Sequence, residues 1–200
     1  RQAQKTAAAA AAAAEPSRLT VRDALENVPP EALEEFVREY ARRDRDFALA
    51  LKTYFAGTVT ESENPYALVL ESALPKNQPS KPLRDPDFRR FRKTLDDLEM
   101  QMNDAIAQHH HRTVFQLASA ILLKTNPLLA TLEETRRNQI LPNIRTAFQK
   151  LMELHAVSAS PELRDAALEV AFELGEKGLL PPELLREGVQ FLSNTAMEEG

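Results

Sequence analysis

Three consecutive histidines, His109, His110 and His111, are the residues of this 200-residue chain with the clearest capacity for chemistry. Imidazole is a common metal ligand and acid–base group. Two ligands on one helix must stand three or four residues apart, because consecutive side chains diverge by about 100°. No acidic residue lies three or four residues from any of these histidines. The spacing therefore argues against a local metal site, although His155 stays open as a distant further ligand.

The three histidines also separate two apolar stripes of helical spacing. One stripe ends at Ile106 and the next begins at Val114. We expect the chain to reverse between them, which would place the imidazoles at the tip of an antiparallel helical hairpin. One unbroken helix of about 40 residues is the structural alternative. A metal-dependent enzyme acting through His109–His111 is the functional alternative.

Other residue types form no catalytic group in the sequence. Adjacent acids, such as Glu34 and Glu35, diverge on a helix, whereas acid–base catalysis needs two carboxylates that converge in a pocket. The chain has no cysteine, and its five glycines form neither a phosphate loop nor a nucleophile elbow. His155 continues an apolar face, so we expect it to be packed and hydrogen-bonded. The expectation is no enzyme, with no catalytic residue, metal or cofactor.

A basic segment with interleaved phenylalanines, residues 81–93, is the candidate contact site for a partner. Basic side chains beside aromatic rings can bind phosphates and stack on bases. However, Phe88 and Phe91 also fit a buried stripe, and three acids follow at once, as on a solvated helix face. Nucleic acid and protein partners both stay open for its six bases, which are Lys81, Arg84, Arg89, Arg90, Arg92 and Lys93.

The composition narrows the class of protein. A net charge of −5, from 25 basic and 30 acidic residues, argues against a dedicated nucleic-acid binder. No apolar run approaches the roughly 20 residues that span a bilayer, so we expect no membrane partner. The absence of cysteine excludes disulfides and fits the cytoplasm, which is the expected location.

Nearly the whole chain after residue 18 has helical periodicity. The pattern predicts helices over 29–44 and 45–57, joined as an antiparallel hairpin, with Phe47, Ala50, Leu51, Tyr54 and Phe55 on the inner face of the second. A longer helix over 85–108 carries a stripe from Phe88 to Ile106. Pro127 is expected to end the helix after the histidines. Pro142 is expected to interrupt the next helical region near its start, so that a helix runs from Pro142 to about residue 156 with a kink or a separate turn before it. Two more helices follow. The prediction is an all-α protein of about eight helices, an irregular α-solenoid or bundle of stacked antiparallel hairpins.

Four segments are expected along the chain. Residues 1–18 contain eight consecutive alanines and would form a linker or helical extension. The chain starts with Arg1, from which we expect a piece of a longer protein or a processed product. Residues 19–75 would form an N-terminal helical unit and 76–86 a proline-rich loop. Residues 87–200 would form a C-terminal unit of helical hairpins.

Two stretches resemble known helical families. Residues 25–56, "LENVPPEALEEFVREYARRDRDFALALKTYFA", resemble the helical segment found beside bacterial SWIM-type zinc fingers. Residues 107–129, "AQHHHRTVFQLASAILLKTNPLL", resemble the turn and second helix of a tetratricopeptide-like pair. The cysteines of the SWIM motif are absent, as is the fixed-period tetratricopeptide consensus. The resemblance implies an α-solenoid that acts as a scaffold.

The expected function is therefore a non-catalytic protein-interaction scaffold or adaptor built from helical hairpins. Its partners would be proteins of unknown identity. An accessory nucleic-acid module that uses residues 81–93 is the main alternative.

Overall fold

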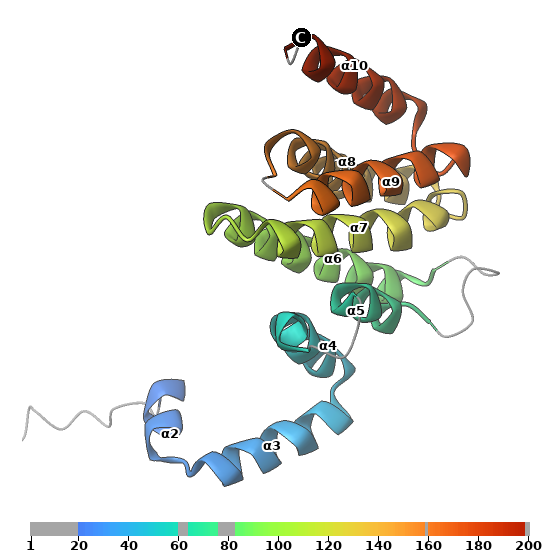
Figure 1. Cartoon of the computed structure of the whole chain (residues 1–200). Helices are drawn as coiled ribbons and strands as arrows, with labels where there is room; N and C mark the ends of the chain where they lie inside the picture. Colours follow the sequence, from blue (N-terminus) through green and yellow to red (C-terminus); the bar gives the residue numbers. More distant parts are fainter. Residues whose placement is uncertain (1–19, 60–63, 76–82, 159, 199–200) are drawn as a thin grey trace, which may run out of the picture. The chain divides into compact units, whose positions relative to one another are not determined.

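A computed structural model describes residues 20–59, 64–75, 83–158 and 160–198, with side chains placed up to residue 191 (Figure 1). Within these ranges the protein contains nine α-helices, one short 3-10 helix and no strand, which confirms the all-α prediction with one helix more than expected. In chain order they are α2 (Val21–Asn27), α3 (Pro30–Arg43), α4 (Arg45–Phe55), η1 (Ala56–Thr58), α5 (Pro65–Ala73), α6 (Asp85–Ala107), α7 (His111–Leu129), α8 (Glu134–Val157), α9 (Pro161–Glu176) and α10 (Pro182–Glu198).

The described residues divide into two units, one before and one after the bond between Arg45 and Asp46. In the first unit, the Thr20 hydroxyl and the Asp23 carboxylate form a capping box that starts α2. Helix α3 begins at Pro30, and it stacks the rings of Phe36 and Tyr40 one turn apart, with centroids 5.8 Å from each other. Neither helix has a buried side chain.

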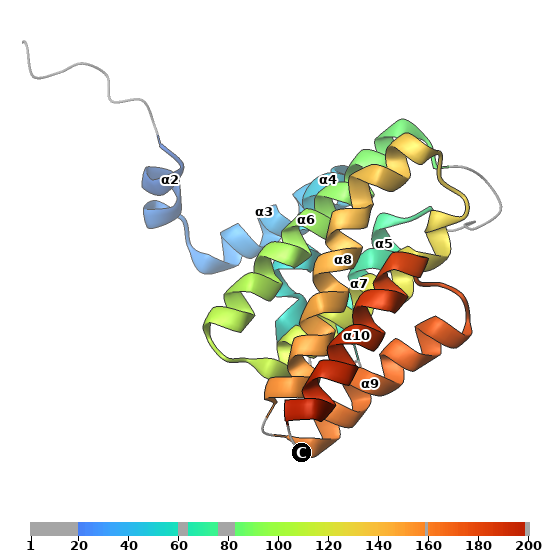
Figure 2. The ribbon, with the colours of Figure 1, turned by 90° about the horizontal axis from the view of Figure 1, so that it is seen from above.

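The second unit is organised around α7. This helix packs against α5, α6, α8 and α9, and α10 packs against α8 (Figures 1 and 2). Leu117, Ile121 and Leu122 of α7 are fully buried and face the apolar stripes of the neighbouring helices. On α6, the predicted stripe from Phe88 to Met102 is buried, and Ile106 is half-buried at its end. Periodicity therefore identified the core of these two long helices correctly.

The predicted reversal at the histidines is confirmed. Helix α6 ends at Ala107, α7 begins at His111, and the two pack on each other. His109 makes the turn with a φ of 56°, in the left-handed region that non-glycine residues rarely occupy. The His110 amide then donates to the carbonyl of Ala105 across the end of α6.

Two predictions drawn from prolines are wrong. Pro127 lies inside α7, which continues to Leu129, and Pro142 lies inside α8, which starts at Glu134. An internal proline removes a main-chain hydrogen bond and disfavours helix. Burial on both sides of each proline outweighs that cost here, since Ile140 and Ile144 flank Pro142 and are fully buried.

The predicted inner face of α4 is also partly wrong. Phe47 and Leu51 are half-buried, but Ala50, Tyr54 and Phe55 are exposed, and the buried side chains are Leu49 and Thr53. Thr53 can be buried because its hydroxyl donates to the Leu49 carbonyl at 2.8 Å. The Thr53 carbonyl in turn accepts a hydrogen bond from Gln101 of α6 at 2.9 Å. These contacts turn α4 away from the orientation that its aromatic residues suggested.

Along the chain, the boundary between the two units lies between Arg45 and Asp46, whereas it was expected at the proline-rich segment 76–86. Helix α5, expected within the unit 19–75, packs on α6 and α7 and buries Tyr66, Val69 and Leu70 in their core. Prolines mark a loop, but a loop can join elements of one core. The expected linker 1–18 lies outside the described residues, as does the segment 76–82. Helices α3 and α4 belong to different units, and their pairing as a hairpin stays a prediction.

Candidate interaction sites

The basic segment lies at the start of α6. Arg84 stands at the N-cap position without a side-chain cap, and Arg89, Arg90, Arg92 and Lys93 follow on the first three turns of the helix. Lys81 lies outside the described residues. Phe88 and Phe91, which could have stacked on bases, are buried in the core instead. The segment therefore has no aromatic surface for a nucleic acid.

Two of these bases, Arg84 and Arg90, are bound to a buried carboxylate. Asp87 is only 2% exposed, and it accepts hydrogen bonds from Arg84 Nε at 3.0 Å and from Arg90 Nη1 at 3.1 Å. Arg90 also pairs with Asp46 of α4. A buried carboxylate is costly to leave unpaired, so these guanidinium groups stabilise the fold.

Two further bases also have partners within the second unit. Lys93 pairs with Asp97 at 3.1 Å, and Arg92 donates to the Gln139 amide oxygen of α8 at 3.1 Å. Arg89 is exposed and has no ion pair among the described residues. A phosphate would therefore have to displace partners that most of these bases already contact.

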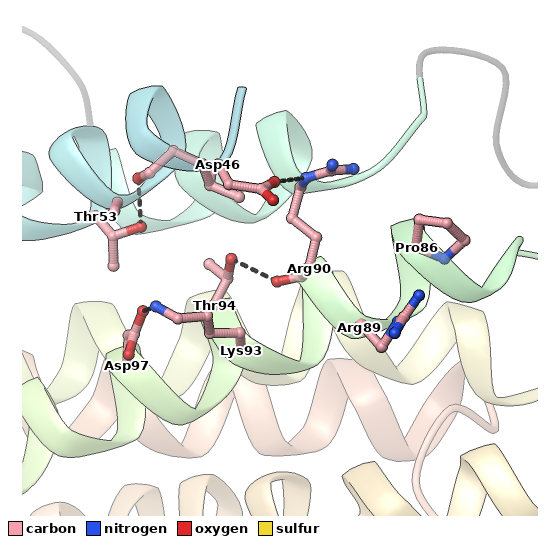
Figure 3. Close-up of a pocket in the computed structure, with 10 residues that line it drawn as sticks. Asp46, Thr53, Pro86, Arg89, Arg90, Lys93, Thr94 and Asp97 are labelled. Carbon is pink, nitrogen blue, oxygen red and sulfur yellow. Dashed lines mark hydrogen bonds and ion pairs between the residues drawn. The ribbon is translucent and has the colours of Figure 1, made fainter. Parts of the chain in front are cut away.

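A cleft of about 350 Å³ lies between α4 and α6, beside this segment (Figure 3). Leu49 and Ala50 provide apolar lining, and Arg89, Lys93 and Asp97 line it from the α6 side. The hydroxyls of Thr53 and Thr94, which also line it, donate to main-chain carbonyls of their own helices. The cleft thus has mixed charge but no hydroxyl activated by a neighbouring base.

The histidines do not form a metal centre in the described part of the chain. His109 and His110 are exposed, and the rings of His109 and His111 lie 6.5 Å apart, edge to face. No group of three or more potential ligands gathers anywhere among the described residues. His155 is half-buried, and its Nδ1 lies 3.3 Å from the Arg164 carbonyl oxygen, which confirms the packed and hydrogen-bonded environment expected for it.

Two groups have a shifted pKa, and each shift has a structural cause. Hydrogen bonds from the Thr20 hydroxyl and backbone lower the pKa of the Asp23 carboxyl at the start of α2. Burial raises the pKa of the Tyr66 hydroxyl in α5. Neither residue lines a described cleft, so neither shift indicates a proton-transfer site.

An apolar groove between α8, α9 and α10 is the second candidate site. It encloses about 150 Å³ and is lined mainly by apolar side chains, including Phe148 and Met152 of α8. Phe172 of α9 and Val189 of α10 stand at its walls and remain 62% and 65% exposed. Large apolar side chains that stay exposed next to an apolar hollow often mark an interaction surface.

Glycines shape this groove. Gly175 of α9 lies close to Leu185 of α10, and Gly188 of α10 lies on the ring of Phe148. The groove could not be predicted from the sequence, because it forms only where three helices meet. The available signal was Phe172, an aromatic residue with an acid three positions before it, Glu169, and another four positions after it, Glu176.

None of the described helices is long and apolar enough to cross a membrane. Comparison with known proteins gives no further identification: no family model, no curated protein and no solved structure matches this chain.

Proposed function

We propose that this protein is a non-catalytic protein-interaction module, a scaffold or adaptor that binds another protein. The observation that carries the proposal is the groove between α8, α9 and α10, with Phe172 and Val189 exposed at its walls. Exposed aromatic side chains at a pocket are the usual anchors of protein interfaces. The resemblance to tetratricopeptide-like helical pairs supports the same function.

The size of the groove favours a protein partner over a small ligand. Pockets for drug-sized molecules or cofactors usually enclose about 300–1,000 Å³. The groove encloses about 150 Å³, which suits one or two side chains of a docking segment. Its lining offers few polar groups with which to orient a substrate, since Glu176 is the only charged residue among those that line it.

The nucleic-acid alternative has less support from the geometry. Four of its five described bases already contact acids or amides of the same unit. Phosphate binding depends on cations that are free to replace counterions. We therefore place the functional surface at the groove rather than at residues 81–93.

A photocrosslinking experiment tests the interaction function. Benzoylphenylalanine replaces Phe172 in the groove or, as a matched control, Met100, an exposed apolar residue of α6. After irradiation in cells of the source organism, we expect specific adducts from position 172 that are lost when Val189→Glu is added. Adducts from position 172 that are no more specific than those from position 100 would contradict the proposal.

A further inference from the structure

The outer face of α9 carries a row of acids interrupted by one phenylalanine. Asp165, Glu169, Phe172 and Glu176 stand at positions i, i+4, i+7 and i+11, a spacing that places them along one helix face. All four are exposed, and Phe172 and Glu176 line the groove. The apolar wall of the groove is thus bordered by carboxylates along α9.

These carboxylates differ from two other acids of the same helices, Glu173 and Glu187. Glu173 pairs with Lys177, and Glu187 lies 3.7 Å from Arg145 of α8. Asp165, Glu169 and Glu176 have no cation within ion-pair distance among the residues that the structure describes. Residues 160–191 contain seven acids and three bases, so their net charge is −4. The acids beside the groove are available to a partner.

The groove can receive one or two apolar side chains from the face of a docked helix. Its two walls come from neighbouring helices, with Phe172 on one and Val189 on the other, above a floor that includes Phe148 and Met152. Figure 2 looks down on α10, which packs on α8, and Leu185 of α10 reaches α9 at Gly175. An amphipathic helix binds such a groove through apolar residues at i, i+3, i+4 and i+7.

We propose that this groove binds an amphipathic helix of a partner protein whose apolar face meets Phe172 and Val189 and whose α9-facing edge carries lysines or arginines. This inference rests on the proposed interaction function and names the chemistry of the partner. The basic edge of the helix pairs with Asp165, Glu169 and Glu176, while an acidic helix or an acidic membrane surface is repelled. Such charge complementarity selects partners and speeds association.

Three synthetic 18-residue peptides test the proposal against the full chain. They share leucines at the apolar positions and differ in the flanking residues, which are Lys/Arg, Gln or Glu. Fluorescence anisotropy measures their affinities at low and high salt. We expect the basic peptide to bind about tenfold more tightly than the acidic one at low salt, since several exposed ion pairs each contribute a fraction of that preference. High salt should reduce the difference.

Matched variants locate the binding site. Glu169→Lys with Glu176→Lys should reverse the preference between the basic and acidic peptides. The control, Glu35→Lys with Asp104→Lys, changes the net charge equally at exposed acids outside the groove and should preserve it. Phe172→Ser should weaken all three peptides, whereas Met100→Ser should not.

The possible failures can be distinguished. Equal binding of the basic and acidic peptides, lost in Phe172→Ser, would overturn the basic partner and keep the groove as an interaction site. Absence of peptide binding together with specific crosslinks from position 172 would overturn the helical partner alone. Sedimentation that shows a dimer abolished by Phe172→Ser would make a second copy the occupant and overturn the proposal. Absence of both peptide binding and specific crosslinks would overturn the proposed function as well.

Discussion

The backbone of Gly188 in α10 lies directly on the ring of Phe148 in α8. A Cβ atom at position 188 would stand 2.8 Å from Cζ of that ring and 3.1 Å from Cε1, closer than carbon atoms normally approach. Phe148 is buried and lines the groove, so its ring has little room to move. The glycine therefore sets how closely α10 approaches α8 and how wide the groove is.

Gly188→Ala tests this contact. In a helix without steric conflict, alanine in place of glycine stabilises by about 0.5–1 kcal/mol. Here we expect destabilisation by about 1–3 kcal/mol, because the added methyl overpacks against Phe148. Thermal unfolding measures the change, and Gln190→Ala, an exposed substitution on the same helix, should have little effect. A stabilised Gly188→Ala protein would contradict the close approach of the two helices.

The buried carboxylate of Asp87 is expected to be a major contribution to stability at the start of α6. Asp87→Ala leaves Arg90, whose side chain is only 17% exposed, with Asp46 as its remaining carboxylate partner, so unfolding should become easier by about 2 kcal/mol. Asp85→Ala, which removes a mostly exposed carboxylate paired with Arg136, should cost less than about 1 kcal/mol. Urea unfolding compares the two. Equal losses of unfolding free energy in the two variants would show that Asp87 contributes no more to stability than the exposed Asp85.

Thr125 in α7 has a fully buried hydroxyl with no hydrogen-bond partner in the described part of the chain. Thr125→Val replaces that hydroxyl with a methyl of similar volume, and it should stabilise the protein by about 1 kcal/mol because an unsatisfied buried polar group is removed. Thr94 is the matched control, since its buried hydroxyl donates to the Arg90 carbonyl at 3.0 Å. Thr94→Val should be neutral or destabilising in the same calorimetric measurement.

Burial of Tyr66 makes stability depend on alkaline pH. Its pKa is raised in the folded protein, so folding favours the neutral phenol. This contribution is fully present below the pKa of the unfolded state, about 10, and is lost as the pH rises through the folded value. Tyr66→Phe should therefore reduce the loss of stability above about pH 10, whereas Tyr54→Phe, at an exposed position, should not. Identical alkaline curves for Tyr66→Phe and the unchanged protein would contradict this role.

The sequence predicted those features that depend on a single helix face. The stripe of α6 from Phe88 to Met102 and the reversal at His109 required only the spacing of apolar residues. The orientation of α4 could not be predicted in this way, because it depends on a Thr53 hydroxyl satisfied by its own helix and on Gln101 from a distant segment. Likewise, the sequence suggests that the cations of the basic segment are free. Their partners Asp46 and Gln139 lie far away in the sequence and contact Arg90 and Arg92 only in the folded protein. The groove forms where three helices meet, with Gly175 close to Leu185 and Gly188 close to Phe148. Contacts between distant helices cannot be read from the periodicity of a single helix.

The turn between α6 and α7 depends on the left-handed conformation of His109. A left-handed φ of 56° strains any residue with a Cβ by about 1 kcal/mol. His109→Gly should relieve this strain and leave the thermal stability equal or higher, despite the greater entropy of glycine in the unfolded chain. His110→Gly, at a φ of −83°, lacks that relief and should destabilise the protein slightly. His109→Val should destabilise most, because a β-branched residue is least tolerant of this conformation. A loss of stability in His109→Gly similar to that in His110→Gly would contradict a turn through the left-handed region and require the chain to pass from α6 to α7 in another way.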